Sequence, residues 1–130
     1  MAKGKQYITA LDIGTSKVVA IIGEVQPDNQ IHIIGFGQET SHGLKSGMVN
    51  NIDATTQTIK KAIREAEVMA DYQVHSVTTG IAGNHIRSLN SQGVVKIKDG
   101  EVTQSDIDRA IETAKAVNIP ADHKILHTVV

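Results

Sequence analysis

Three β-branched, largely apolar segments separated by two short turns fill the first 37 residues, and they restrict the possible folds more than any other feature of this 130-residue chain. The segments are residues 7–13, 18–25 and 31–37, and the turns contain Gly-Thr-Ser-Lys at 14–17 and Gln-Pro-Asp-Asn at 26–29. Valine and isoleucine favour extended strands, whereas glycine, proline and asparagine favour tight turns. The sequence therefore predicts a three-stranded antiparallel meander.

A helix and a further strand are predicted to follow the meander. Its three strands are apolar on both faces, which predicts helices over one side of the sheet or both. Residues 41–50 are predicted to form an ordered loop, and Asp53 is expected to be the N-cap of a helix that ends near Tyr72. The apolar face of this helix consists of Ile59, Ala62, Ile63, Ala66, Met69 and Ala70. Residues 74–81 are predicted to return as a strand, which completes an α/β unit.

The remaining residues, from about 84 onward, differ in character. A strand is predicted within residues 87–97, and Thr103 with Asp106 is expected to form a capping box at the start of a second helix. Residues 124–130 are predicted to form a last strand with no turn or polar tail behind it. Because this part has too little apolar surface for a core of its own, we expect the chain to be truncated and its sheet to be completed by residues beyond it.

Composition excludes several functional classes. The chain has no cysteine, which excludes disulfides, thiolate metal sites and cysteine nucleophiles and fits a reducing cytoplasm. The formal charge is -1 and aromatic residues make up 2%, so the basic surface and the stacking platforms of nucleic-acid-binding proteins are missing. No apolar segment approaches the ~20 residues that span a bilayer, and the start of the chain has no signal-peptide core. These features predict a cytosolic protein with no nucleic-acid partner.

The residues Asp-Ile-Gly-Thr-Ser-Lys at 12–17 are the chemically suggestive part of the chain. Backbone N–H groups in such a turn can converge on an anion, the hydroxyls of Thr15 and Ser16 can donate hydrogen bonds, and Lys17 adds a positive charge, a set that suits phosphate. Asp12 would then hold a hydrated Mg²⁺, because two anionic groups placed close together need a cation between them. The same six residues are typical of a plain hairpin turn, which they favour when taken alone, so both interpretations stay open.

Other sites receive no support from the sequence. Residues 35–37 lack the third glycine of the dinucleotide-binding fingerprint, and no Walker sequence occurs. His123 and His127 would lie about 13 Å apart along a strand, which argues against a shared metal ion. Neither Ser16 nor Ser41 has the histidine and aspartate pattern of a hydrolase triad. No catalytic residue is therefore assigned.

The predicted order of elements, with a glycine-containing turn between the first two strands, is that of the first half of an actin-like nucleotide-binding domain. Four motifs narrow the resemblance: Leu-Asp-Ile-Gly-Thr-Ser-Lys-Val at 11–18, Ile-Gly-Phe-Gly at 34–37, Gly-Leu-Lys-Ser-Gly-Met-Val-Asn at 43–50 and Ile-Ala-Gly-Asn-His-Ile at 81–86. Together they resemble the FtsA family of bacterial cell division proteins, which belongs to the actin-like ATPase superfamily. The resemblance covers essentially the whole chain.

The resemblance implies an α/β fold, namely an actin-like (ribonuclease H-like) half-domain with a small inserted α+β subdomain. Residues 1–83 would form the first part of the nucleotide-binding subdomain 1A, and residues 84–130 the start of the inserted, SHS2-like subdomain 1C. The implied ligands are ATP and Mg²⁺. By the same resemblance the metal site is Asp12, and the residues that bind the nucleotide phosphates are Gly14, Thr15, Ser16 and Lys17.

The function that this family resemblance implies is that of a cell division scaffold, with weak ATPase activity at most, and not primarily a catalyst. Such a protein polymerises, tethers the FtsZ ring to the inner membrane at the septum, and recruits later division proteins through the inserted subdomain. It is peripheral on the cytoplasmic side of that membrane, to which it attaches only through a C-terminal helix that these residues do not contain. The alternatives are a small-metabolite kinase and a pilus-assembly relative of the same superfamily.

Overall fold

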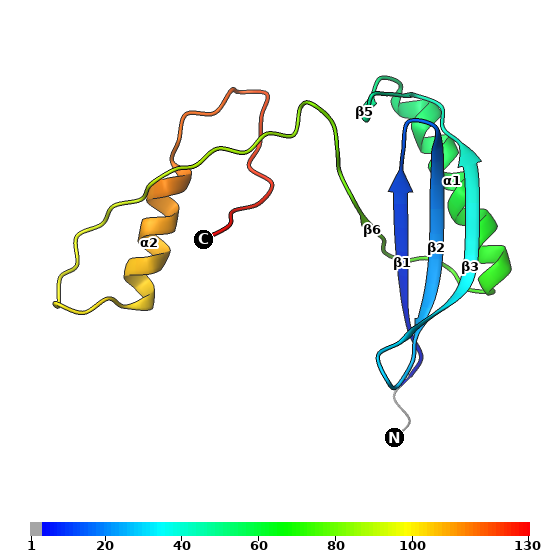
Figure 1. The fold of residues 1–130 in the computed structure, drawn as a ribbon, viewed down its shortest axis with the longest axis horizontal. Coiled ribbons are helices and arrows are strands. Elements are labelled where there is room, and N and C mark those ends of the chain that lie inside the picture. The colour runs from blue at the N-terminus through cyan, green and yellow to red at the C-terminus, as the bar shows by residue number, and fades with distance from the viewer. Residues whose placement is uncertain (1–3) are drawn as a thin grey trace. The chain divides into compact units, whose positions relative to one another are not determined.

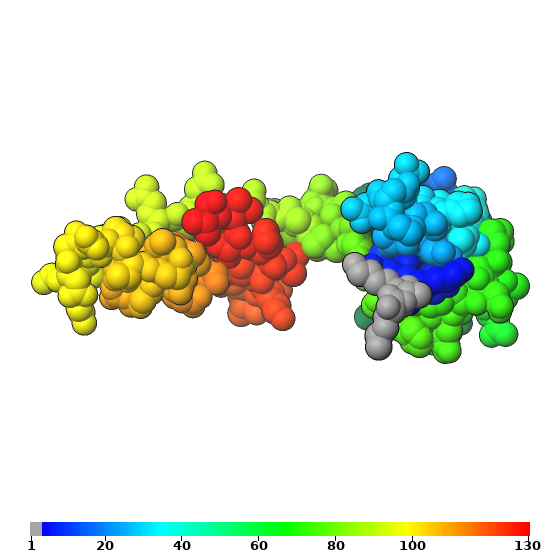
Figure 2. Space-filling view, turned by 90° about the horizontal axis from the view of Figure 1, so that it is seen from below, coloured from blue at the N-terminus to red at the C-terminus, as the bar shows by residue number. Residues whose placement is uncertain are grey.

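The computed structural model describes residues 4–130, which divide into two compact units. One unit ends at Arg87 and the other comprises Ser88–Val130. In the space-filling view of Figure 2, the blue, cyan and green parts of the chain make up the first unit, and the yellow to red parts belong to the second. Residues 1–3 lie outside the described residues. They belong to the start of the chain, where the sequence predicts no signal-peptide core.

The first unit is built on a four-stranded sheet with the strand order β3-β2-β1-β6. Strands β1 (Gln6–Ile13), β2 (Lys17–Val25) and β3 (Ile31–Thr40) are paired antiparallel in sequence order, with a register shift at Ile22/Gly23. The short strand β6 (Thr78–Thr79) lies parallel to β1 on its other side. The predicted meander is therefore confirmed (Figure 1).

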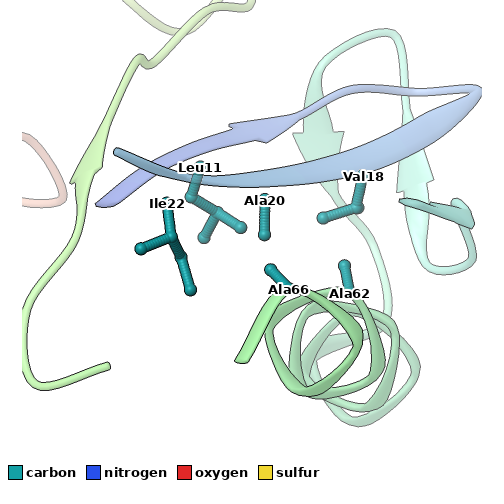
Figure 3. Packing of buried hydrophobic residues seen from close by; sticks show 6 residues of the cluster. All are labelled: Leu11, Val18, Ala20, Ile22, Ala62 and Ala66. Carbon is teal, nitrogen blue, oxygen red and sulfur yellow. The ribbon is translucent and has the colours of Figure 1, made fainter. Parts of the chain in front are cut away.

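Helix α1 (Ile52–Ala70) covers one face of this sheet (Figure 1). Side chains from β1, β2 and α1 form the buried core, as Figure 3 shows for Leu11, Val18, Ala20, Ile22, Ala62 and Ala66. Among residues 4–87 α1 is the only helix, so the other face of the sheet stays open. On that open face Ile8, Ile33 and Phe36 are 42%, 54% and 41% exposed. The apolar strands predicted helices over one side of the sheet or both, and this unit has a helix over one side.

Glycine on β3 and alanine on α1 let the helix lie unusually close to the strand. A Cβ atom at Gly37 would stand 1.9 Å from the carbonyl oxygen of Ala62, and one at Gly35 would stand 2.4 Å from that of Ala66. Both distances are far inside van der Waals contact, so the two backbones touch where any other residue would hold them apart. The Gly-x-Gly of the strand and the alanines four residues apart on the helix are therefore one packing motif.

The predicted start and buried face of α1 are partly wrong. The N-cap is Asn51 and not Asp53, because the Asn51 side chain accepts a hydrogen bond of 2.9 Å from the Ala54 N–H. Met69 is 62% exposed, whereas Thr55 and Thr58 are buried. The two threonine hydroxyls donate to backbone carbonyls one turn earlier in the helix, at 2.8 and 2.9 Å, so their burial leaves no polar group unsatisfied.

Several strand predictions are also wrong. Only Thr78 and Thr79 of the expected strand 74–81 are paired, and residues 87–97 and 124–130 form no strand. The expected loop 41–50 contains a small hairpin made of β4 (Leu44–Lys45) and β5 (Met48–Val49). A strand exists only where a second strand satisfies its backbone groups, and residues 88–130 as described offer no such partner. The apolar pattern of a segment carries no information on whether a pairing strand is present.

The second unit is organised around helix α2 (Gln104–Lys115), whose predicted capping box is confirmed. The Thr103 hydroxyl accepts from the Asp106 N–H, and the Asp106 carboxylate accepts from the Thr103 N–H at 3.0 Å and from its hydroxyl at 2.8 Å. Gly93 lies against the helix much as Gly37 does in the first unit, since a Cβ there would stand 1.8 Å from the carbonyl oxygen of Ala110. The Ser91 hydroxyl donates to the Ala114 carbonyl at 2.8 Å.

The capping box makes the start of α2 sensitive to acid. Hydrogen bonds from Thr103, followed by the contact with Arg109, hold the pKa of the Asp106 carboxyl below its ordinary value. A carboxylate whose pKa is lower in the folded state stabilises the fold at pH above its unfolded value of about 3.9, and this contribution is lost as the pH falls through the lowered value. We expect the NMR signals of α2 to be lost at lower urea concentration as the pH is reduced below about 4.

Two variants separate the capping carboxylate from general acid denaturation. Asp106→Asn should remove most of the acid dependence of α2, because an amide does not titrate, and should weaken the helix at neutral pH. Asp108→Asn replaces an exposed carboxylate on the same helix and should keep the acid dependence. Equal acid dependence in the parent and in Asp106→Asn would assign the effect to another group.

Candidate functional site

The turn between β1 and β2 is closed by its own backbone. The Gly14 N–H donates to the Lys17 carbonyl at 2.9 Å, and a Cβ atom on Gly14 would stand 2.9 Å from that same oxygen. A side chain at position 14 would therefore push the turn open. Position 14 requires glycine because a Cβ there would lie so close to the Lys17 carbonyl oxygen. The Gly14 N–H already donates within the turn and is not available to a ligand.

Two backbone donors remain at the tip of the turn. Within residues 4–130 the N–H groups of Thr15 and Ser16 make no hydrogen bond, and both residues are exposed. The Ser16 carbonyl is occupied, since it accepts from the Ser41 N–H at 3.0 Å. Adjacent amides that point out of a turn without partners are the groups that bind an anionic oxygen in backbone nests.

The charged residues of the predicted site lie on one face of the sheet. Leu11 and Ile13 pack toward the core, so Asp12 between them lies on the open face away from α1. Val18 is fully buried, so the side chain of Lys17, the residue before it, leaves the strand on the open face. Among the described residues neither charge takes part in a salt bridge. The carboxylate and the ammonium group are thus both available to a ligand at this end of the strands.

The hairpin β4–β5 joins the turn, and sequence reasoning missed it. The Gly47 N–H at the hairpin tip donates to the Thr15 hydroxyl oxygen at 3.0 Å. Ser46 and Gly47 both have left-handed backbone angles, with φ of 50° and 78°. A Ser-Gly pair is a recognised turn signal, and this pair could have indicated the hairpin. Figure 1 shows β5 at the same end of the sheet as the β1–β2 turn.

A second hydroxyl near the turn lacks a partner. The Oγ of Ser41, whose N–H is bonded to Ser16, is shielded from solvent and makes no hydrogen bond within residues 4–130. A buried polar atom of this kind is satisfied by a water molecule or by a ligand group. The donor set next to the β1–β2 turn is therefore larger than the six residues that the sequence indicated, and it fits a ligand rich in anionic oxygens.

The metal-ligating residues of the chain are scattered. In the described part of the chain, no three histidine, aspartate or glutamate side chains converge on one point. His123 contacts Asp122 at 2.8 Å rather than His127. A single carboxylate such as Asp12 fits Mg²⁺, which commonly keeps several water ligands and binds through one carboxylate together with phosphate oxygens.

One protein family model matches the last 48 residues of the chain. The model is described as the SHS2 domain inserted in FTSA, and it covers residues 83–130. The matched residues begin five positions before the second compact unit, which starts at Ser88.

Curated relatives match the chain as a whole. It is 69% identical over 130 residues to "Cell division protein FtsA" of Neisseria meningitidis, an alignment that covers 100% of this chain and 31% of the relative. A protein of the same name from Pseudomonas aeruginosa is 56% identical over 123 residues, and one from Escherichia coli K12 is 40% identical over 128 residues. These alignments cover 95% and 98% of this chain and 30% of each relative. The chain therefore spans about 30% of the length of these relatives.

Proposed function

Because this chain is related over its whole length to the FtsA cell division proteins, we propose that it supplies the phosphate-binding part of an actin-like, ATP-binding scaffold of cell division. The observation that carries the proposal is the identity of 69% with a protein of that name across all 130 residues. A match of this extent involves both units of the chain, and so it favours a division role over a general membership of the actin-like superfamily.

The proposed ligand is ATP with Mg²⁺. The free N–H groups of Thr15 and Ser16, with their hydroxyls, would hold phosphate oxygens, and Gly14 would keep the turn tight enough for the approach. Lys17 would neutralise phosphate charge from the open face of the sheet. Asp12 would orient the water shell of Mg²⁺, which when bound screens the phosphate charges from the carboxylate. No residue of the chain is assigned to catalysis, and any hydrolysis would be slow.

The proposed architecture is an actin-like (ribonuclease H-like) half-domain followed by the start of an inserted subdomain. The antiparallel meander β1-β2-β3, followed after the hairpin β4–β5 by α1 and by a β6 that returns parallel to β1, supports residues 1–83 as part of the nucleotide-binding subdomain 1A. The family match supports residues 84–130 as the start of subdomain 1C.

The proposed partners are those of a division scaffold: further copies of the protein in a filament, FtsZ, and later division proteins that would bind the second unit. Location at the septum, on the cytoplasmic side of the inner membrane, follows from this role. No helix in residues 4–130 is long and apolar enough to cross a bilayer. By the family resemblance, membrane attachment would come from a C-terminal amphipathic helix.

A chimeric protein tests the proposed function. This chain would replace the matching segment of the Neisseria meningitidis protein, which the identity of 69% makes feasible. Incubated with Mg²⁺-ATP and vesicles of anionic lipid, the chimera is expected to form filaments on the vesicle surface in electron micrographs and to bring purified FtsZ to the vesicles. The unmodified Neisseria protein and the chimera without ATP are the controls. A soluble monomer that phosphorylates a small hydroxyl compound would favour the kinase alternative instead.

A further inference from the structure

The hydroxyl of Thr15 links the proposed phosphate turn to the hairpin β4–β5, and nothing in the function described above requires that link. The link is the 3.0 Å hydrogen bond from the Gly47 N–H to the Thr15 oxygen. The two residues are 32 positions apart, so the contact is a tertiary one between separate elements of the first unit.

The hairpin is held by hydrogen bonds at its base, and at its tip Gly47 also lies against Ala82 and Gly83. At the base, the Gly43 carbonyl accepts from the N–H groups of both Asn50 and Asn51, at 2.8 and 3.1 Å. Only two residue pairs join β4 to β5. At the tip, Met48 and Val49 are 43% and 52% exposed, and the hydrogen bond to Thr15 ties the tip to the sheet.

Threonine chemistry makes this bond responsive to a ligand. A hydroxyl oxygen has two lone pairs and carries one proton, so Thr15 can accept from Gly47 and still donate to another acceptor. A phosphate oxygen held by the Thr15 and Ser16 amides would take that proton in a charge-assisted hydrogen bond. Donation to an anion polarises the hydroxyl and strengthens the bond that its oxygen accepts, because hydrogen bonds in a chain reinforce one another.

We propose that Thr15 is a positioning residue that couples the phosphate turn to the hairpin, so that binding of a di- or triphosphate tightens the Gly47–Thr15 bond and fixes the hairpin tip. The inference rests on the proposed phosphate binding by the turn. It adds that residues 44–49 respond to the ligand without touching it, which makes the exposed Met48 and Val49 a surface whose order depends on occupancy of the site.

Amide hydrogen exchange of the ¹⁵N-labelled 130-residue chain tests this coupling, with Mg²⁺ and inorganic pyrophosphate as the probe. Without the probe, Thr15→Val should make the Gly47 amide exchange about fivefold faster than in the parent, the ratio that a typical net hydrogen bond supplies. Thr15→Ser should keep the parent rate, because serine retains the hydroxyl. With the probe, Gly47 exchange should slow by up to about 1.7-fold in the parent and in Thr15→Ser but not in Thr15→Val.

Two further variants serve as controls for the role of the Thr15 hydroxyl. Thr40→Val removes an exposed hydroxyl at the end of β3 and should leave the Gly47 response intact. Thr15→Ala repeats the loss of the hydroxyl without a branched side chain, and should match Thr15→Val.

The possible outcomes separate this inference from the proposed function. If the amides of residues 14–17 respond to the probe and Gly47 does not, or exchanges faster, the coupling is wrong while phosphate binding stands. A Gly47 response as large as the parent's in Thr15→Val or in Thr15→Ala would also overturn it, because the effect would then not pass through the hydroxyl. If no amide of the turn responds, both the phosphate-binding proposal and the coupling fail.

Discussion

Replacing Gly37 by alanine is expected to lower the stability of the first unit by at least about 3 kcal/mol, a large fraction of the roughly 5–15 kcal/mol that holds a typical domain folded. The added methyl group would meet the carbonyl oxygen of Ala62 at 1.9 Å and the Ala66 nitrogen at 2.9 Å. These are backbone atoms in the middle of α1, so no side-chain rotation relieves the clash. The strand and the helix must move apart, which opens the core around Ala20 and Ala62.

Urea denaturation followed by circular dichroism measures this loss, and two other glycines supply matched controls. Gly80→Ala adds the same methyl group where nothing lies within 4 Å, and should change stability little. Gly93→Ala places its Cβ 1.8 Å from the carbonyl oxygen of Ala110 and should disrupt the second unit while NMR signals from the sheet remain. A Gly37→Ala protein as stable as Gly80→Ala would mean that α1 does not lie this close to β3.

The parts of the fold that the sequence predicted are those determined by neighbouring residues. The meander follows from β-branched runs and turn residues within 37 positions, and the capping box of α2 from Thr103 and Asp106 alone. The strands predicted at 87–97 and 124–130 failed because pairing needs a second strand, which no local pattern supplies. The contact of Gly35 and Gly37 with α1 was likewise missed, since it joins residues that are 31 and 25 positions apart in the sequence.

In the candidate site, too, the sequence indicates features made by neighbouring residues and not contacts between distant ones. Residues 12–17 stay a predicted phosphate site, which the sequence indicates because a carboxylate, a glycine and two hydroxyls stand together in it. The hydrogen bond from Gly47 to Thr15 cannot be predicted from the sequence, which indicates a loop for the residues of the hairpin. The N-cap of α1 was placed two residues late because Asn51 and Asp53 are both good capping residues, and only the bond to Ala54 distinguishes them.

Replacing Asp12 by alanine is expected to weaken binding of Mg²⁺-ATP at least about tenfold, equivalent to about 1.4 kcal/mol, when measured by calorimetry on the Neisseria chimera. In the proposed site this carboxylate acts on the phosphates only through the hydrated cation. In excess EDTA the direction should therefore reverse, with the variant binding ATP as tightly as the chimera or more tightly, because the alanine no longer repels the phosphate charges.

Two further variants test whether this reversal in ATP affinity is specific to the metal role of Asp12. Asp53→Ala removes an exposed carboxylate in the first turn of α1 and should leave ATP affinity unchanged in both conditions. Gly14→Val should weaken binding with and without Mg²⁺, because its Cβ would stand 2.9 Å from the Lys17 carbonyl and open the turn that holds the phosphates. If Asp12→Ala instead lost affinity equally with and without the cation, the aspartate would be shaping the turn like Gly14, and the metal role proposed for it would be wrong.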